Sequence, residues 1–193
     1  YGCTTRTASP TAACSPAVPV QPPPAAGCPN PGLNGQMISF DGQGLWVPQN
    51  FPVVAGGNVN LRDCASVPGH GHIIQSPDFT LNFTANPQNY ELEFRVDATC
   101  DSVLLVNDAN GQWHFDDDGG DGLNSRLRIA GANPGMYDIW VGTYGGSNCN
   151  ATLTAETFPG QGGISRPQPT ALPDPGNMTA YRGQNGQTFS FEV

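Results

Sequence analysis

The residues with the clearest chemical potential lie in an acidic loop, residues 116–122, whose sequence DDDGGDG places four carboxylates among three glycines. Calcium takes about six to eight oxygen ligands from carboxylates, carbonyls and water on flexible backbone, and such a loop provides them. The expected calcium ligands are Asp116, Asp118 and Asp121, with Asn107, Asp108 or Asp101 from the adjacent turn. The spacing departs from the EF-hand pattern, and the alternative is a solvated turn whose aspartates cap their own backbone.

A second group with metal-binding chemistry is the pair His70 and His72, in the sequence GHGH. Residues two apart on a strand point to the same face, so both imidazoles could converge on one ion. A metal site needs further ligands, and the only other histidine of the chain is His114. The sequence therefore favours no metal at this pair.

Catalytic residues are not evident in the sequence. No serine lies in a GxSxG elbow, the histidines have no recognisable partners, and the six cysteines are expected to form disulfides. The carboxylates of the acidic loop are poor general acids, because nothing in a solvated glycine-rich loop desolvates them to raise a pKa. We expect a protein that is not an enzyme.

Four aromatic residues could form a surface on which sugar rings stack. They are Trp113, Tyr137, Trp140 and Tyr144. Aromatic residues that alternate along strands belong more often to a core. The sequence leaves both interpretations open, an exposed ligand surface and a buried cluster.

The elements that must position these residues are β-strands. Of the 193 residues, 25 are Gly and 19 are Pro, and no amphipathic helix is evident, so all-β structure is expected. The predicted strands are residues 37–40, 45–47, 52–61, 79–84, 90–96, 102–106, 112–115, 126–130, 136–143 and 150–158. They suffice for a jelly-roll-like antiparallel β-sandwich. Its predicted core includes Phe79, Leu81, Phe83, Leu92, Phe94 and Val96.

The chain divides into four predicted parts. They are a Cys/Pro-rich N-terminal arm (1–36), the β-sandwich domain (37–158), a Pro/Gly linker (159–178) and a C-terminal segment that ends in a strand (179–193). The strand character is carried by Thr188, Phe189, Phe191 and Val193, and the two phenylalanines share one face. A lone strand cannot satisfy its own backbone groups, so we expect it to pair with a sheet edge.

Two parts of the chain resemble known families. The stretches PVVAGGNVNL, GHGHIIQSPDFTLNFT, CDSVLLVNDANGQWHFDDDGGDGLNSRLRI, GMYDIWVGTYG and CNATL are similar to the pre-peptidase C-terminal (PPC) type of β-sandwich of secreted alphaproteobacterial proteins. This resemblance covers about residues 52–158 and implies a jelly-roll-like accessory module, usually non-catalytic, carried beside peptidase or other extracellular domains. Residues 179–193, TAYRGQNGQTFSFEV, resemble the start of an LCCL domain.

Six cysteines without a CxxC pair, in a chain that starts at Tyr1 rather than Met, indicate a mature exported protein with disulfides rather than a zinc site. Their spacing leaves the connectivity open. The expected pairs are Cys3 with Cys14, Cys28 with Cys64, and Cys100 with Cys149. The resemblance implies the last pair, and proximity along the chain then assigns the other two.

Charge limits the class of partner. The chain has no lysine, and seven arginines oppose sixteen Asp and Glu, which gives a net charge of −9. Nucleic acid and anionic membrane surfaces would repel such a chain. No apolar run approaches the ~20 residues of a membrane span.

The first functional hypothesis is a non-catalytic structural subunit, secreted or at the cell surface, whose partners are copies of itself. The terminal strand of one copy would pair with a sheet edge of the next, and such head-to-tail contacts propagate into a filament or surface layer. The alternative is an accessory module of a secreted enzyme that binds carbohydrate or a cell-surface protein, with calcium as a stabilising ion.

Overall fold

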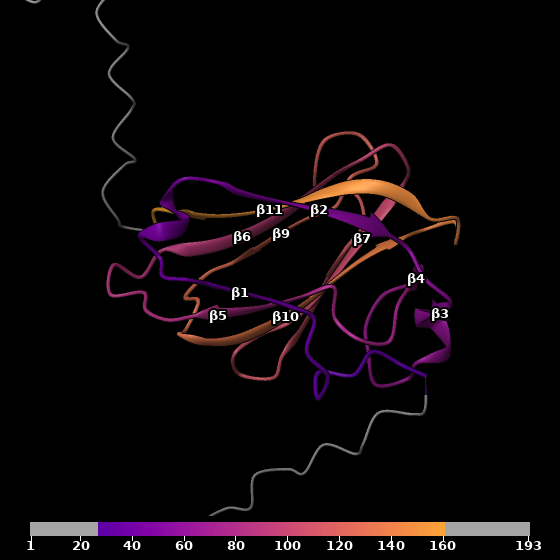
Figure 1. Cartoon of the computed structure of the whole chain (residues 1–193), viewed down its shortest axis with the longest axis horizontal. Helices are drawn as coiled ribbons and strands as arrows, with labels where there is room; N and C mark the ends of the chain where they lie inside the picture. Colours follow the sequence, from indigo (N-terminus) through magenta and orange to yellow (C-terminus); the bar gives the residue numbers. More distant parts are fainter. Residues whose placement is uncertain (1–26, 161–193) are drawn as a thin grey trace, which may run out of the picture.

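The computed structural model describes residues 27–160, which form two β-sheets packed face to face (Figure 1). The elements in chain order are β1 (Gln36–Phe40), η1 (Gly44–Trp46), β2 (Gln49–Ala55), β3 (Val59–Asn60), η2 (Leu61–Asp63), β4 (His72–Ile73), β5 (Phe79–Phe83), β6 (Glu91–Ala98), β7 (Ser102–Asn107), β8 (Trp113–Asp116), β9 (Arg126–Ile129), β10 (Gly135–Thr143) and β11 (Cys149–Phe158). The predicted all-β sandwich is confirmed. No described helix is long and apolar enough to cross a membrane.

In sheet A the strands lie in the order β1, β5, β10, β4, β3. In addition, β7 pairs with β10, and β8 pairs with β7. Sheet B has the order β2, β11, β6, β9. Among the described strands, every pairing is antiparallel except that of β1 with β5. β8, before the acidic loop, belongs to sheet A, and β9, after it, belongs to sheet B, so the loop crosses from one sheet to the other.

The main hydrophobic core lies between the two sheets. Phe79, Leu81 and Phe83 of β5 are at most 2% exposed, and Leu92 and Phe94 of β6 are fully buried. Apolar residues at every second position give a strand one buried face, so the pattern of these strands dictates which side meets the other sheet. The core residues predicted for both strands are confirmed.

A second core lies on the outer face of sheet A. Val103 of β7 and Trp140 of β10 point away from the main core and are covered by Leu61 and Ile73, which belong to the segment around β3 and β4. The Cys28–Cys64 disulfide (S–S 2.01 Å) ties this cover to the segment that precedes β1, and the predicted pair is confirmed. β7 is consequently buried on both faces, which explains its continuous apolar sequence.

Residues 45–47 do not form the predicted strand. The Asp41 carboxylate accepts the N–H of Gly44 (2.6 Å), and the Asp41 carbonyl accepts the N–H of Leu45 (3.1 Å). These local hydrogen bonds turn the chain into the 3-10 helix η1, which buries Leu45 in the main core. The prediction was wrong because a short apolar run does not distinguish a strand from one helical turn.

The predicted strand 52–61 is interrupted. β2 ends at Ala55, and Gly57 then approaches the backbone of Ile73 so closely that a Cβ at this position would collide with it. Only glycine permits such a close approach of two backbones. The chain resumes as the short β3, which pairs with β4 in sheet A.

The described chain begins and ends at opposite ends of the sandwich (Figure 1). Near its beginning, the N–H of Asn30 donates to the carbonyl of Gln75 (2.9 Å), just before β5 starts. At its end, Gly160 lies against Asn89, beyond the far end of β5. Residues 161–178 of the predicted linker, the C-terminal strand and the Cys3–Cys14 pair lie outside the described residues.

Candidate functional site

The acidic loop connects β8 of sheet A to β9 of sheet B and is held by its own hydrogen bonds. Asp116 Oδ1 accepts the backbone N–H of Gly119 (2.8 Å) and that of Arg126 (2.7 Å). The N–H of Gly120 donates to the carbonyl of Asn124 (2.7 Å). Asp116 therefore caps its own backbone, which is the alternative to calcium that the sequence left open.

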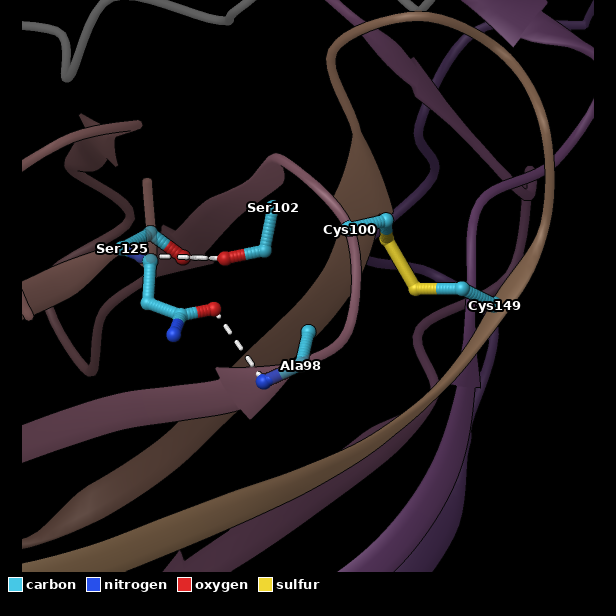
Figure 2. Close-up of a disulfide and its surroundings, with 6 residues drawn as sticks. Ala98, Cys100, Ser102, Ser125 and Cys149 are labelled. Atoms are coloured by element: carbon cyan, nitrogen blue, oxygen red, sulfur yellow. Dashed lines mark hydrogen bonds between the residues drawn. A yellow bond between two sulfur atoms is a disulfide. The ribbon is translucent and has the colours of Figure 1, made fainter. Parts of the chain in front are cut away.

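The base of the acidic loop is attached to β6 and β7 (Figure 2). Ser102 Oγ accepts the N–H of Ser125 (2.9 Å), and the two hydroxyl oxygens lie 3.1 Å apart. The N–H of Ala98 donates to Asn124 Oδ1 (3.1 Å). Both serines are fully buried. Because buried polar groups are costly to leave unpaired, these bonds fix where the loop leaves the sandwich.

The Cys100–Cys149 disulfide lies beside the loop base (Figure 2). It links the β6–β7 turn to the first residue of β11, with an S–S distance of 2.02 Å, and the pair implied by the resemblance is confirmed. A disulfide stabilises a fold by about 2–4 kcal/mol, largely by restricting the unfolded chain. Two such bonds are typical of proteins in oxidising compartments.

His70 packs against the acidic loop from the other side. Its Nε2 lies 2.8 Å from Asp117 Oδ2. Its ring contacts those of Phe115 and Tyr144 edge-on, with centroid distances of 5.2 and 5.0 Å. A pocket of about 160 Å³ adjoins this group and is lined by Asn60, Arg62, His70, Gly71, His72 and Tyr144.

The two neighbouring histidines differ in their surroundings. His72 Nδ1 is shielded from solvent and has no hydrogen bond within the described part of the chain, and its ring lies against Gly146. His70 is paired with Asp117, and His114, which precedes Phe115 in β8, is paired with Asp108. Only His72 belongs to a strand, so the pair lacks the common face that a strand would give it.

The predicted calcium ligands fall into two groups. Asn107 pairs with Trp113 beside the β7–β8 turn, whereas Asp116 pairs with Leu104 at the other end of this hairpin. Asn107 and Asp108 are therefore separated from the acidic loop by most of the length of the hairpin, at a rise of ~3.3 Å per residue. Calcium ligands must all lie within ~2.6 Å of the ion. A single site that combines both groups was a wrong prediction.

At the loop end, Asp101 approaches two carboxylates of the acidic loop. Partial burial raises its pKa, and the negative charges of Asp118 and Asp117 raise it further, against the opposing effect of His70. In the part of the chain that the structure describes, no three His, Cys, Asp or Glu side chains are grouped so that they could hold a metal ion. Calcium at this loop stays a prediction.

Asp108 instead organises the β7–β8 turn. Its Oδ1 accepts the N–H groups of Asn110 (2.8 Å) and Gln112 (2.9 Å), and its Oδ2 lies 2.8 Å from His114 Nε2. Burial alone would raise the pKa of Asp108, but these hydrogen bonds outweigh burial and lower it. This carboxylate has a structural role in the turn.

The four aromatic residues do not share an exposed surface. Trp140 is fully buried in the second core, where its indole lies 5.4 Å from that of Trp113 and donates to the carbonyl of Gln75 (3.3 Å). Tyr137 is 1% exposed in the main core. Only Tyr144, at 46%, is well exposed. Of the two interpretations that the sequence left open, burial therefore holds for Tyr137 and Trp140, which lie three positions apart on β10 and face two different cores.

A polar groove of about 320 Å³ lies where the acidic loop meets the outer face of sheet B. It is lined by Arg95, Val96, Asp97, Gly120, Asp121, Asn124, Arg126 and Thr154. A hollow of about 230 Å³ adjoins it and shares Asp97. The volume of the groove is at the lower end of the range for small-molecule sites, about 300–1,000 Å³.

The groove has both hydrogen-bond donors and acceptors. Arg95 is engaged by Glu93 (3.0 Å) and Glu156 (2.7 Å), and these contacts raise its pKa although burial opposes them. Within residues 27–160, Arg126 forms no side-chain ion pair, so its guanidinium is available. Sequence reasoning missed the groove, because Arg126 and β6 meet only through the pairing of β9 with β6.

No known protein family matches this chain, and no curated protein matches it. Among solved structures, it is similar to PliG of Aeromonas hydrophila, a periplasmic lysozyme inhibitor of g-type lysozyme. The two are 13% identical, the match covers 64% of this chain and 98% of PliG, and the TM-score is 0.38. A similarity of this size carries no argument about function. The resemblances to the PPC-type sandwich and the LCCL domain remain predictions.

Proposed function

We propose that this protein is a non-catalytic structural subunit of an extracellular assembly, in which copies join head-to-tail through their terminal segments. The observation that carries the proposal is the position of the chain ends. The segment before β1 starts at the end of the sandwich near Gln75, and Gly160 leaves at the opposite end near Asn89 (Figure 1). Extensions that leave a domain at opposite ends can contact different neighbours, and repeated heterologous contacts produce an open chain of subunits.

The two disulfide bridges of the described domain support a mechanical role, because they restrict how far the chain can unfold. The Cys28–Cys64 bridge holds the cover of the second core, and the Cys100–Cys149 bridge joins the β6–β7 turn to β11 beside the base of the acidic loop. His70 and His114 each have an aspartate partner, so a catalytic triad would need only a nucleophile beside one of them. No serine or cysteine side chain among the described residues donates to either histidine, so a nucleophile–base pair is not formed there.

Sedimentation velocity of the full chain over a range of concentrations tests the proposal. The unaltered chain should form species that grow with concentration, and a chain that lacks residues 187–193 should remain a folded monomer. A truncated chain that assembles as well as the full chain would contradict the role of the terminal segment. Near-UV circular dichroism of both chains serves as the control for folding.

A second candidate function, a carbohydrate-binding module, is favoured by the polar groove. Asp97 and Asp121 would repel an anion, and the free guanidinium of Arg126 would repel a cation, whereas a neutral polyhydroxyl ligand can use all three side chains. Affinity electrophoresis in gels that contain neutral soluble polysaccharides tests this function. The function is supported if a polysaccharide retards the unaltered chain and Arg62→Ala, whose change lies outside the groove, but does not retard Arg126→Ala. A mobility unaffected by any polysaccharide would refute it.

A further inference from the structure

We propose that the terminal strand of a second copy, residues 188–193, inserts between β1 and β2. The acceptor is the β1–β2 seam, defined as Ile38, Phe40, Phe51 and Val53 with the free edge of β1. The inference rests on the proposed head-to-tail assembly and identifies the surface that receives the strand.

The seam lies along one side of the sandwich, where an edge strand of each sheet is exposed. β1 has one described neighbour in sheet A, β5, and β2 has one in sheet B, β11. Both strands run across the same side of the molecule, joined by η1 (Figure 1). Phe40 of β1 contacts Phe51 of β2 across the sheets at a centroid distance of 6.3 Å.

The apolar side chains of the seam are incompletely covered. Ile38 and Phe40 of β1 and Phe51 and Val53 of β2 pack against the main core, yet all four are only partly buried, unlike Phe79 behind them. Phe51 lies 5.6 Å from Phe79, ring centre to ring centre, so the seam is continuous with the core. Further apolar side chains placed over the seam would extend the core and remove this surface from water.

The backbone of β1 can accept another strand. The N–H of Gln36 donates to the carbonyl of Asp78, just before β5, and the Phe40 carbonyl accepts the N–H of Thr84, just after it, both at 2.9 Å. Because alternate residues of a strand direct their backbone groups to opposite sides, Met37 and Ser39 direct theirs away from β5. β2 is the poorer acceptor, because Pro52 has no N–H and interrupts the donors along that edge.

The terminal segment matches this acceptor in pattern and reach. In the sequence TFSFEV, Phe189 and Phe191 share one face, so an added strand would place both rings over the apolar seam. The opposite face carries Thr, Ser and Glu and suits the solvent. Between Gly160 and Thr188 lie 27 residues, which can extend to roughly 90 Å at ~3.3 Å each, enough to reach a neighbouring domain.

Full-length variants separate donor from acceptor. The acceptor variant, Ser39→Pro, removes an N–H that points away from β5, and Ser39→Ala is the matched control that keeps this N–H. The donor variant replaces both Phe189 and Phe191 by Ser, which removes the apolar face of the terminal strand. We expect Ser39→Pro and the donor variant to sediment as monomers, and Ser39→Ala to assemble like the unaltered chain. Should Ser39→Pro fail to unfold cooperatively, Met37→Pro tests the other outward N–H.

Mixing the two disabled chains gives the decisive result. The Ser39→Pro chain keeps its donor strand, and the chain with both phenylalanines replaced keeps its acceptor, so an equal mixture should form a one-to-one dimer that grows no further. A mixture that stays monomeric overturns the inference. If the Ser39→Pro chain assembles like the unaltered chain, the β1–β2 seam is not the acceptor, and the proposed head-to-tail assembly still stands. If the unaltered chain never assembles, both the seam and the proposed function are refuted.

Discussion

Asp78 is a carboxylate whose ionisation should weaken this fold. It precedes β5, and its Oδ2 accepts the N–H of Val141 (2.8 Å), at the point where β10 passes beyond β5. Burial raises the pKa of Asp78 to about 7, although the hydrogen bond from Val141 opposes this effect. We predict that Asp78→Asn stabilises the protein at pH 8, because an amide oxygen still accepts the N–H of Val141 and no charge is buried.

The expected magnitude follows from the two pKa values. A rise from 3.8 to about 7 corresponds to roughly 4 kcal/mol, at ~1.4 kcal/mol per pKa unit. Because the side chain of Asp78 is partly exposed, we expect about 2–4 kcal/mol. The folded pKa is above the unfolded one, so the stability from the protonated group is fully present below pH ~3.9 and is lost as the pH rises through about 7.

The assay is urea unfolding of both chains from pH 4 to pH 8.5, followed by tryptophan fluorescence. The free energy of unfolding of Asp78→Asn should exceed that of the unaltered chain at pH 8, and the difference should fall towards zero at pH 4. Asp97→Asn, at an exposed position, controls for the loss of one negative charge. A difference between Asp78→Asn and the unaltered chain that does not depend on pH would refute the reasoning.

Three further predictions concern the turn, the loop base and the ion. Asp108→Ala should lower the free energy of unfolding by roughly 1–3 kcal/mol in urea titrations at pH 7, because two turn N–H groups lose their acceptor, while Asp108→Asn should cost less. The pKa of Asp108 is lowered in the folded protein, so the ionised carboxylate stabilises the fold at pH values above the unfolded pKa, and this stabilisation is lost as the pH falls through the folded pKa. Acid unfolding of the unaltered chain, compared with that of Asp108→Asn, would detect the loss. Replacing Cys100 and Cys149 by Ser should cost about 2–4 kcal/mol in the same unfolding assay, and an unchanged midpoint would contradict the role of this bridge. If the acidic loop binds calcium, chelation lowers the melting temperature of the unaltered chain and not that of Asp121→Asn; an equal response of both chains excludes the loop.

The parts of the fold that could be predicted are those with local signals. Alternating apolar residues in β5 and β6 identified their buried faces, and the NDANG turn identified the β7–β8 hairpin. The sequence could not reveal the second core, because residues 103–106 of β7 form a continuous apolar run with no polar face, and the residues that cover it come from a distant segment joined by Cys28–Cys64. Tyr137 and Trp140, three positions apart on β10, point to opposite faces of the strand and therefore fall into different cores.

The candidate site shows the same division. The acidic loop was evident from its composition, and the backbone capping by Asp116 agrees with one of its two interpretations. The loop's partners were not evident: Asp117 meets His70 from a separate loop, and Asp121 meets Arg126 and Asp97 only because β9 pairs with β6 across from the loop. Such groupings depend on sheet topology, which local patterns do not specify.

Negative-stain electron microscopy of the purified full chain at increasing concentration tests the proposed head-to-tail assembly most directly. The predicted result is unbranched filaments whose axial repeat equals one sandwich domain, with none formed by the chain that lacks residues 187–193. Isolated single particles at every concentration, or closed particles of fixed size, would contradict an open head-to-tail contact.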